Sequence, residues 1–290
     1  MAIQVVKIRD FIGHSQSVYS IAVDRDKKII FSGGGDGFIV KWNLDETDGV
    51  LIAKQDSAVY CLHKDHSYLF CGTQGGLLSI FNSEFNLHRQ IKLSDKPIFD
   101  CIPFKTNFIV AAGDGVLRVL NSSLDLIKSI KLSEMSLRSV IITTSCIAVA
   151  SSDSCVYLLD HSFNLLETLC DHEGSVFTLL YSKKNRSLIS GGKDARMKQY
   201  SENVFEKSID AHLLHIHTLS LHPDEMYFLS GSMDKEIKLW ETKSMRLLKV
   251  INSSKLDAHT SSVNKILWFD KNNFISCSDD RTIKCFELHL

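Results

Sequence analysis

The sequence predicts an all-β protein built as a closed ring of seven repeated four-stranded sheets. Three observations predict it: a motif that recurs seven times, short apolar runs separated by turn residues, and only three prolines in 290 residues. Length alone would favour about two domains of ~150 residues. A ring of repeats instead places residues 1–290 in one domain, because every unit packs on its neighbours.

The recurring motif is a turn followed by a short run that ends in a large apolar or aromatic residue. Its copies begin at residues 33, 72, 111, 150, 191, 231 and 277, so successive offsets are 39, 39, 39, 41, 40 and 46 residues. Asp stands fourth in six of the seven copies, and an apolar residue always follows three positions later. This regularity indicates repeated structural units.

Each copy also contains two further apolar runs, which lie ahead of the motif or overlap its start. The first copy has VYSIAV (18–23) and IIFSG (29–33), and the sixth has HTLSL (217–221) and YFLSG (227–231). Gly, Asp, Asn and Ser separate these runs, which is typical of antiparallel strands joined by tight turns. A unit of ~40 residues cannot bury both of its faces alone, whereas a ring of such units can. The predicted architecture is therefore a seven-bladed β-propeller.

The two ends of the chain complement each other. The run IQVVKIRDF (3–11) precedes the first copy, and the last copy reaches Leu290 after its third strand. We expect the N-terminal strand to complete the last blade as its outer strand, which would close the ring and cover an open sheet edge.

Composition narrows the functional classes. Hydrophobic residues make up 44% and charged residues 23%, which excludes a disordered chain. The net charge of -1 provides no general attraction for nucleic acid or an anionic membrane. No apolar run approaches the ~18 residues of a membrane span, and Lys7, Arg9 and Asp10 interrupt the place of a secretory signal. We expect a cytoplasmic, monomeric protein.

Eight cysteines are scattered along the chain without a Cys-x-x-Cys pair, mostly within apolar runs. They are expected to be buried free thiols and not disulfides or metal ligands. They are Cys61, Cys71, Cys101, Cys146, Cys155, Cys170, Cys277 and Cys285.

The frame of the first copy resembles the WD-repeat family of β-propellers. Gly13-His14 is followed after 18 residues by Ser32, and then by Asp36 and Trp42. The sixth copy repeats the frame, and the resemblance extends over essentially the whole chain.

The resemblance implies a hydrogen-bonded network of His, Ser, Asp and Trp inside a blade, in which the carboxylate accepts and the indole donates. Its recurrence favours a structural role over a catalytic triad. Copies two to four lack the His; copies three and four end in Leu120 and Leu159, where apolar packing is expected to replace the network. The network residues are His14, Ser32, Asp36 and Trp42; His172, Ser190 and Asp194; His212, Ser230, Asp234 and Trp240; and His259, Ser276 and Asp280.

The resemblance also implies a partner-binding face, formed by the starts of the innermost strands and the turns between second and third strands. We call it the top face. The candidate contact residues flank the first apolar residue of each inner strand or precede the turn Asp. They are Tyr19, Tyr60, Gln74, Phe99, Arg138, Phe177, Lys193, His215, His217, Met233, Asn264 and Asp279.

Four aromatic residues in this set occupy the same repeat position, and two basic residues accompany them. Such a rim suits a partner that offers an apolar side chain and a carboxylate. Alternatively, the rings plug the channel mouth or pack between blades.

The sequence contains little that indicates chemistry. His215 and His217 fall on one side of a strand and could hold a metal, but His212 belongs to the expected network and no Cys or acidic ligand is suitably spaced. We therefore expect neither a metal nor a cofactor, and no Gly-rich phosphate loop occurs. The interpretation is a non-catalytic interaction scaffold for a protein or peptide. A small-molecule or RNA binder, or an enzyme with a site at the channel mouth, are the alternatives.

Overall fold

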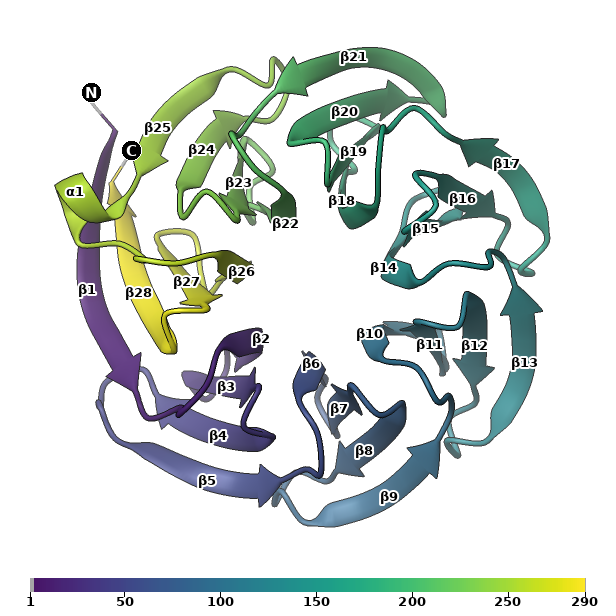
Figure 1. The fold of residues 1–290 in the computed structure, drawn as a ribbon, viewed down its shortest axis with the longest axis horizontal. Helices are drawn as coiled ribbons and strands as arrows, with labels where there is room; N and C mark the ends of the chain where they lie inside the picture. Colours follow the sequence, from purple (N-terminus) through teal and green to yellow (C-terminus); the bar gives the residue numbers. More distant parts are fainter. Residues whose placement is uncertain (1–2, 290) are drawn as a thin grey trace.

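The computed structural model describes residues 3–289 and confirms the predicted seven-bladed β-propeller (Figure 1). Its strands form seven four-stranded antiparallel sheets around a central channel. Helix is confined, within the described residues, to the four-residue α1 (Ser253–Leu256), so none of the helices there is long enough to cross a membrane.

The blades follow one another along the chain, each with its strands in order from the channel outward. Blade 1 contains β2 (Val18–Asp24), β3 (Ile29–Gly34), β4 (Phe38–Asn43) and β5 (Gly49–Lys54); blade 2 contains β6 (Val59–Lys64), β7 (Leu69–Thr73), β8 (Leu77–Phe81) and β9 (Leu87–Lys92). Blade 3 contains β10 (Ile98–Phe104), β11 (Asn107–Ala112), β12 (Val116–Leu120) and β13 (Leu126–Lys131); blade 4 contains β14 (Leu137–Ile142), β15 (Ile147–Ser151), β16 (Val156–Leu159) and β17 (Leu165–Leu169). Blade 5 contains β18 (Val176–Ser182), β19 (Ser187–Gly192), β20 (Arg196–Ser201) and β21 (Val204–Asp210); blade 6 contains β22 (Ile216–Leu221), β23 (Tyr227–Ser232), β24 (Ile237–Glu241) and β25 (Leu247–Ile251). Blade 7 contains β26 (Val263–Trp268), β27 (Asn273–Ser278), β28 (Thr282–His289) and β1 (Gln4–Ile12).

The predicted closure of the ring by the N-terminal strand is confirmed. β1 lies beside β28 in Figure 1 and pairs with it antiparallel, from Gln4 opposite His289 to Ile12 opposite Thr282. Phe11 on β1 is fully buried and its ring centroid lies 5.7 Å from that of Trp42 in blade 1. The strand therefore both covers an edge and packs between the last blade and the first.

The core lies between blades more than within them. Phe31 and Ile39 of blade 1 share one buried cluster with Val59 and Leu69 of blade 2, and the other blade boundaries repeat this arrangement. The middle strands β7, β15 and β19 are buried along their whole length, whereas the outer strand β13 is largely exposed. Each sheet therefore depends on its neighbours to bury its faces.

Every inner strand carries a β-bulge at the same repeat position. The pairing register of each inner strand with the next strand shifts across one extra residue, as between Ile98 and Asp100. A bulge interrupts the alternation of side chains between the two faces of a sheet. The seven bulged residues are Tyr19, Tyr60, Phe99, Arg138, Phe177, His217 and Asn264.

The residue after the bulge ties several blades together. Ser20 Oγ accepts a hydrogen bond from the Leu62 backbone N–H of the next blade at 2.8 Å. Asp100 Oδ2 accepts from Val140 N–H at 2.9 Å in the same way. These bonds satisfy buried backbone donors that the bulged ladder would leave free.

The cysteine prediction is confirmed for six thiols and wrong for two. The six are buried and free, but Cys155 and Cys170 form a disulfide with their Cα atoms 4.2 Å apart. Cys155 precedes β16 and Cys170 follows β17, and Val156 pairs with Leu169 across these strands. The antiparallel hairpin therefore places the two cysteines opposite each other, although 15 residues separate them in sequence.

Candidate binding site at the channel mouth

The blade networks are hydrogen-bonded in a defined direction. In blade 1, His14 Nδ1 lies 3.1 Å from the Asp36 carboxylate and Nε2 lies 2.8 Å from Ser32 Oγ. Trp42 Nε1–H donates to the same Ser32 Oγ at 2.8 Å. Since the carboxylate can only accept, the imidazole donates its Nδ1–H to Asp36, and in that tautomer Nε2 accepts the proton of the Ser32 hydroxyl.

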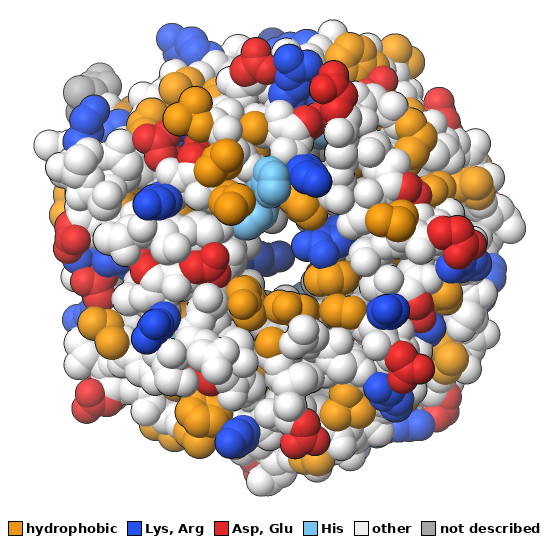
Figure 2. Space-filling view, viewed as in Figure 1, with side chains coloured by type: hydrophobic (Ala, Val, Ile, Leu, Met, Phe, Trp, Pro, Cys, Tyr) orange, Lys and Arg blue, Asp and Glu red, His pale blue; other side chains and the backbone are white. Residues whose placement is uncertain are grey.

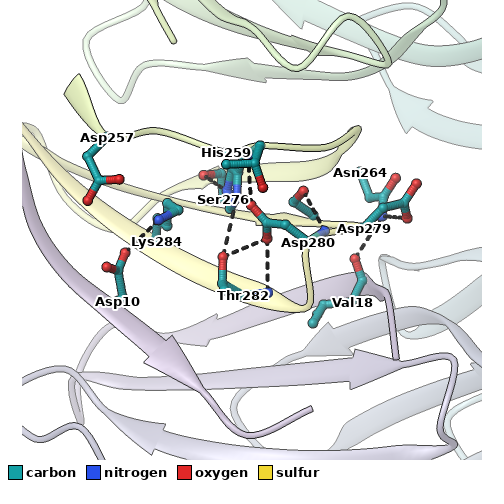
Figure 3. A network of polar contacts seen from close by, with 12 residues as sticks. Asp10, Val18, Asp257, His259, Asn264, Ser276, Asp279, Asp280, Thr282 and Lys284 are labelled. Atoms are coloured by element: carbon teal, nitrogen blue, oxygen red, sulfur yellow. Dashed lines mark hydrogen bonds and ion pairs between the residues drawn. The ribbon is translucent and has the colours of Figure 1, made fainter. Parts of the chain in front are cut away.

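Three other blades contain this His, Ser and Asp arrangement. In blade 6 the His212–Asp234 and His212–Ser230 distances are 2.9 and 2.7 Å, and Trp240 completes the network. Blades 5 and 7 form the same bonds around His172 and His259 without a Trp, and Figure 3 shows the blade 7 network. These serines are fully buried, so the networks hold the fold and offer no route for a substrate.

The turn Asp has a second role that does not need the histidine. Asp234 Oδ1 accepts the N–H of Glu236 two residues later, and Asp114 and Asp153 accept the N–H of Val116 and Cys155 in the same way. Such Asx turns stabilise the tight connection between strands. This explains why the Asp recurs in blades without the His.

The expectation that apolar packing replaces the network in blades 3 and 4 is confirmed for the terminal residues, since Leu120 and Leu159 are fully buried, but it is wrong for the turn Asp, which keeps polar partners. In blade 3, Asp114 accepts a hydrogen bond from Ser94 Oγ at 2.9 Å and forms an ion pair with Arg118 at 2.5 Å. In blade 4, Asp153 accepts from Ser133 Oγ and, at 2.6 Å, from the Tyr157 hydroxyl. A serine before the inner strand replaces the imidazole, and a long polar side chain on the third strand reaches back to the carboxylate.

Blade 2 lacks the turn Asp and uses amides instead. Ser79 Oγ donates to Gln55 Oε1 at 2.8 Å and accepts from Gln90 Nε2 at 3.0 Å. The buried hydroxyl thus has both a donor and an acceptor partner.

The central channel opens on the top face into a cavity of about 450 Å³. Figure 2 shows hydrophobic, basic and histidine side chains gathered around this opening. Eight of the twelve predicted partner-binding residues line the cavity: Tyr19, Tyr60, Phe99, Arg138, Phe177, His217, Asn264 and Asp279.

The seven bulged residues form a continuous belt, which we call the channel ring. The Tyr60 ring centroid lies 5.0 Å from that of Tyr19 and 5.7 Å from that of Phe99. The Arg138 guanidinium carbon lies 3.9 Å from the centroid of Phe99 and 4.9 Å from that of Phe177. The channel ring comprises Tyr19, Tyr60, Phe99, Arg138, Phe177, His217 and Asn264.

The remaining members complete the belt. His217 lies 5.7 Å from Phe177 between ring centroids, and its Nδ1 lies 3.2 Å from Ser262 Oγ. Asn264 Nδ2 donates to Asp279 Oδ1 at 2.8 Å and to the Val18 carbonyl at 2.9 Å, which links the last blade to the first (Figure 3).

Sequence reasoning missed four residues that also line the cavity: Asp100, Ser139, Thr178 and Lys265. Each directly follows a channel-ring residue. Strict alternation along a strand would turn that next side chain away from the channel, but the bulge lets both face it. The sequence carries no separate signal for this bulge.

Four predicted residues lie outside the cavity lining: Gln74, Lys193, His215 and Met233. His215 still approaches it, with its ring centroid 6.0 Å from that of Phe177. Met233, 44% exposed, donates its backbone N–H to the His215 carbonyl, and Leu213, 86% exposed, donates its N–H to Asp234, the residue after Met233. The top of blade 6 therefore presents an apolar ledge next to the channel.

His215 and His217, the two candidate metal ligands, lie near each other on the top face. His215 and His217 have ring centroids 6.3 Å apart and join no metal-like cluster within residues 3–289. There, the cluster that could hold an ion combines His212, Asp234 and Glu236. Both ring nitrogens of His212 are already hydrogen-bonded within the blade 6 network.

The charges of the cavity are unevenly satisfied. Two acidic residues have hydrogen-bond donors: Asp100 accepts from Val140 N–H, and Asp279 accepts from Asn264. Among the residues the structure describes, the Arg138 and Lys265 side chains form neither a hydrogen bond nor an ion pair, although both are half-buried. Desolvation by burial lowers the pKa of Arg138 to about 10.

The fold and these networks define the class: a propeller whose blades are built on a repeated His, Ser, Asp and Trp frame. The family model described as WD domain, G-beta repeat matches residues 5–43, 163–201, 203–241 and 251–287, which together make up more than half of the chain. The chain belongs to this WD-repeat family. The matched segments contain all four histidine networks, and the long unmatched stretch 44–162 contains blades 2 and 3 and strands β14 to β16 of blade 4.

Curated relatives resemble parts of the chain. Protein HIR1 from Eremothecium gossypii is 27% identical over 136 residues, which are 41% of this chain and 16% of that protein. Actin-interacting protein 1 from Drosophila melanogaster is 24% identical over 123 residues, 41% of this chain and 20% of the relative. A ribosome biogenesis protein WDR12 homolog from Drosophila virilis is 27% identical over 119 residues, which are 39% of this chain and 27% of that protein. The matched segments thus span less than a third of these relatives.

Proposed function

We propose that this protein is a non-catalytic interaction scaffold that binds a peptide or protein loop at the mouth of its channel. The carrying observation is the channel ring, in which seven equivalent positions bring four aromatic side chains and one arginine around a single opening. Aromatic and arginine side chains provide large contact areas at modest entropic cost and dominate binding interfaces. Membership of the WD-repeat family supports a protein or peptide partner.

The dimensions of the cavity favour a segment over a whole domain. A volume of about 450 Å³ accommodates a few side chains. The exposed apolar ledge at Leu213 and Met233 adjoins the opening and extends the contact beyond one inserted side chain. A loop or an extended peptide could occupy both.

The geometry gives less support to catalysis. Ser262 Oγ lies 3.2 Å from His217 Nδ1, a contact that resembles a nucleophile and its base. However, Ser262 is buried and absent from the lining of the cavity, so a substrate in the cavity would not reach its hydroxyl. The four other Ser–His contacts belong to the buried blade networks.

Nucleic acid and small molecules remain the competing ligands. Aromatic residues beside basic ones can stack bases. However, the cavity lining contains two acidic residues, Asp100 and Asp279, besides Arg138 and Lys265, so apart from histidine it has no net positive charge. A polyanion therefore has little electrostatic advantage.

A selection from a random peptide display library on the immobilised protein tests the proposal. We expect enriched peptides whose affinity, measured by calorimetry, falls at least tenfold in the double variant Phe99→Ala/Arg138→Ala. A matched control, Lys27→Ala/His66→Ala, alters a separate charged cavity beneath blades 1 and 2 and should leave the affinity unchanged.

Two outcomes would overturn the proposal. One is full binding of the selected peptides by the double variant, which would place the binding surface elsewhere. The other is enrichment of a random RNA pool without any peptide, which would favour the nucleic-acid alternative. Circular dichroism of the double variant separates lost contacts from lost folding.

A further inference from the structure

The most unusual group in the channel ring is the Arg138 guanidinium. Phe99 and Phe177 flank it, with their ring centroids 3.9 and 4.9 Å from its central carbon. A guanidinium held over aromatic rings keeps its N–H groups directed outward from its edge. Among residues 3–289, these donors have no protein acceptor. The Arg138 nitrogens are not among the fully buried polar atoms without a hydrogen-bond partner, so solvent or a ligand can reach them. They face the cavity that Arg138 lines.

This arrangement decides the sign of the ligand's charge. An aromatic cluster on its own would attract a cation, but the protein's own guanidinium already occupies the faces of Phe99 and Phe177. A second cation would meet Arg138 and Lys265, both in the lining of the same cavity. An anion or another acceptor would satisfy donors that now have none.

The acidic residues limit that anion to a small charge. The Asp100 and Asp279 carboxylates lie in the same lining and already accept hydrogen bonds. They would repel a dianion more strongly than a single carboxylate. A carboxylate also matches the planar fork of the arginine, to which it can bind through two parallel hydrogen bonds.

We propose that Arg138, held between Phe99 and Phe177, binds the side-chain carboxylate of an Asp or Glu residue in the partner segment. This inference rests on the proposed function, because it names the residue type that a bound peptide inserts into the channel mouth. Tyr19 and Tyr60 lie on the Phe99 side of the site and contact the aliphatic part of the inserted side chain. Lys265 adds a second positive charge to the cavity.

The test uses blocked amino acids as probes, followed by nuclear magnetic resonance. The ¹⁵N-labelled chain of 290 residues is titrated with N-acetyl-glutamate α-amide and, separately, with N-acetyl-glutamine α-amide, which has the same shape without the charge. We expect saturable shifts at the amides of residues 99, 138 and 177 and at Arg138 Nε–H, with the glutamate probe binding at least fivefold more tightly. Lowering the pH through the probe's carboxyl pKa of about 4.3 should abolish this difference.

Three variants distinguish a specific site from a general field. Arg138→Met removes the charge, and Arg138→Lys keeps the charge but loses the planar fork; both should weaken the glutamate probe at least fivefold. Lys193→Met removes a top-face charge outside the cavity lining and should change the affinity less than twofold. Arg138→Lys keeps the test valid if Arg138→Met fails to fold.

Each contrary result has a distinct meaning. Equal binding of the two probes at the channel ring would overturn the carboxylate inference and leave peptide binding intact. Equal losses in Lys193→Met and Arg138→Met would show a general charge effect. Tighter binding of N-acetyl-phosphoserine α-amide than of the glutamate probe would overturn the choice of a carboxylate. Failure of the proposed function itself would appear in the display selection, where the double variant would retain its peptides.

Discussion

Asp10 on the first strand accepts a hydrogen bond from Lys284 on the last strand, with 3.0 Å between Oδ1 and Nζ. The two residues are 274 positions apart in sequence. The other carboxylate oxygen of Asp10 pairs with Lys7 at 2.7 Å, so one acidic group bridges both strands. The contact fastens the ring at the point where its two ends meet.

Deleting residues 1–10 should destabilise the ring by several kcal/mol, because β28 then loses its partner strand and exposes a hydrogen-bonding edge. Differential scanning calorimetry and size-exclusion chromatography measure the effect. As a control, Asp10→Asn keeps the strand and removes only the ion pairs with Lys7 and the buried Lys284, which should cost less than the loss of the whole strand. An unchanged melting temperature with monomeric elution after the deletion would contradict the closure.

Asp234→Ala should lower the free energy of unfolding by roughly 1–3 kcal/mol, because His212 and the Leu213 N–H lose their acceptor. Blade 3 lacks the His, which alone would favour a smaller cost for Asp114→Ala, but the bonds of Asp114 to Ser94 and Arg118 indicate a cost of similar size. Urea denaturation of both variants measures this. A negligible effect of Asp114→Ala would show that the blade 3 network contributes little.

Acid should weaken the protein between about pH 4 and pH 2. Burial opposes ionisation of Asp234, but its hydrogen bonds from His212, Leu213 N–H and Glu236 N–H prevail and lower its pKa to about 2, from 3.8 for an ordinary Asp. A folded-state pKa below the unfolded value means that this stabilisation is present above pH 4 and is lost as pH falls through the folded value. In Asp234→Asn, the melting temperature should change less with pH in this window than it does in the wild type. A slope identical to wild type would contradict the assignment.

Arg138→Met should leave the melting temperature unchanged or raise it, because it removes a half-buried charge without a partner and retains the apolar stem between Phe99 and Phe177. Arg118→Met is the matched control: it leaves Asp114 without its ion pair and should lower the melting temperature. Thermal melts of both compare them directly. If Arg138→Met destabilises as much as Arg118→Met, the guanidinium supports the fold and is not reserved for a ligand.

Reducing the Cys155–Cys170 disulfide should destabilise the protein by about 1–3 kcal/mol, since the bridge closes a loop of 15 residues between neighbouring strands. Melting with and without dithiothreitol measures this, and Cys155→Ala/Cys170→Ala should abolish the difference. The denatured, unreduced protein should titrate six thiols. Eight titrating thiols would contradict the bridge.

The repeat frame was sufficient to predict much of the architecture. Because each Asp recurs with an apolar residue three positions later, the strands, the number of blades and the role of β1 in closure follow from spacing alone. The His, Ser, Asp and Trp frame is similarly local: its hydrogen-bonded partners are 10 to 22 positions apart within one repeat, and the fold of one blade brings them together.

Contacts between non-equivalent residues required the tertiary structure. Sequence reasoning assigned apolar packing to blade 3, whereas Arg118 reaches Asp114, and it left Cys155 and Cys170 unpaired. In each case the contact depends on a residue type that changes between repeats: Arg118 and Tyr157 share one repeat position that other blades fill differently, and Cys155 and Cys170 have no equivalent cysteines there. Periodicity carries no information about it.

The site itself depends on both levels. The sequence by itself determined that Tyr60, Phe99 and Arg138 occupy equivalent positions in successive blades. Only the tertiary structure decided that Arg138 lies between Phe99 and Phe177, because ring closure brings side chains some 40 residues apart in sequence to within van der Waals reach. It also decided that Asp100 and Lys265 face the channel, because a β-bulge is a feature of strand pairing and not of strand composition.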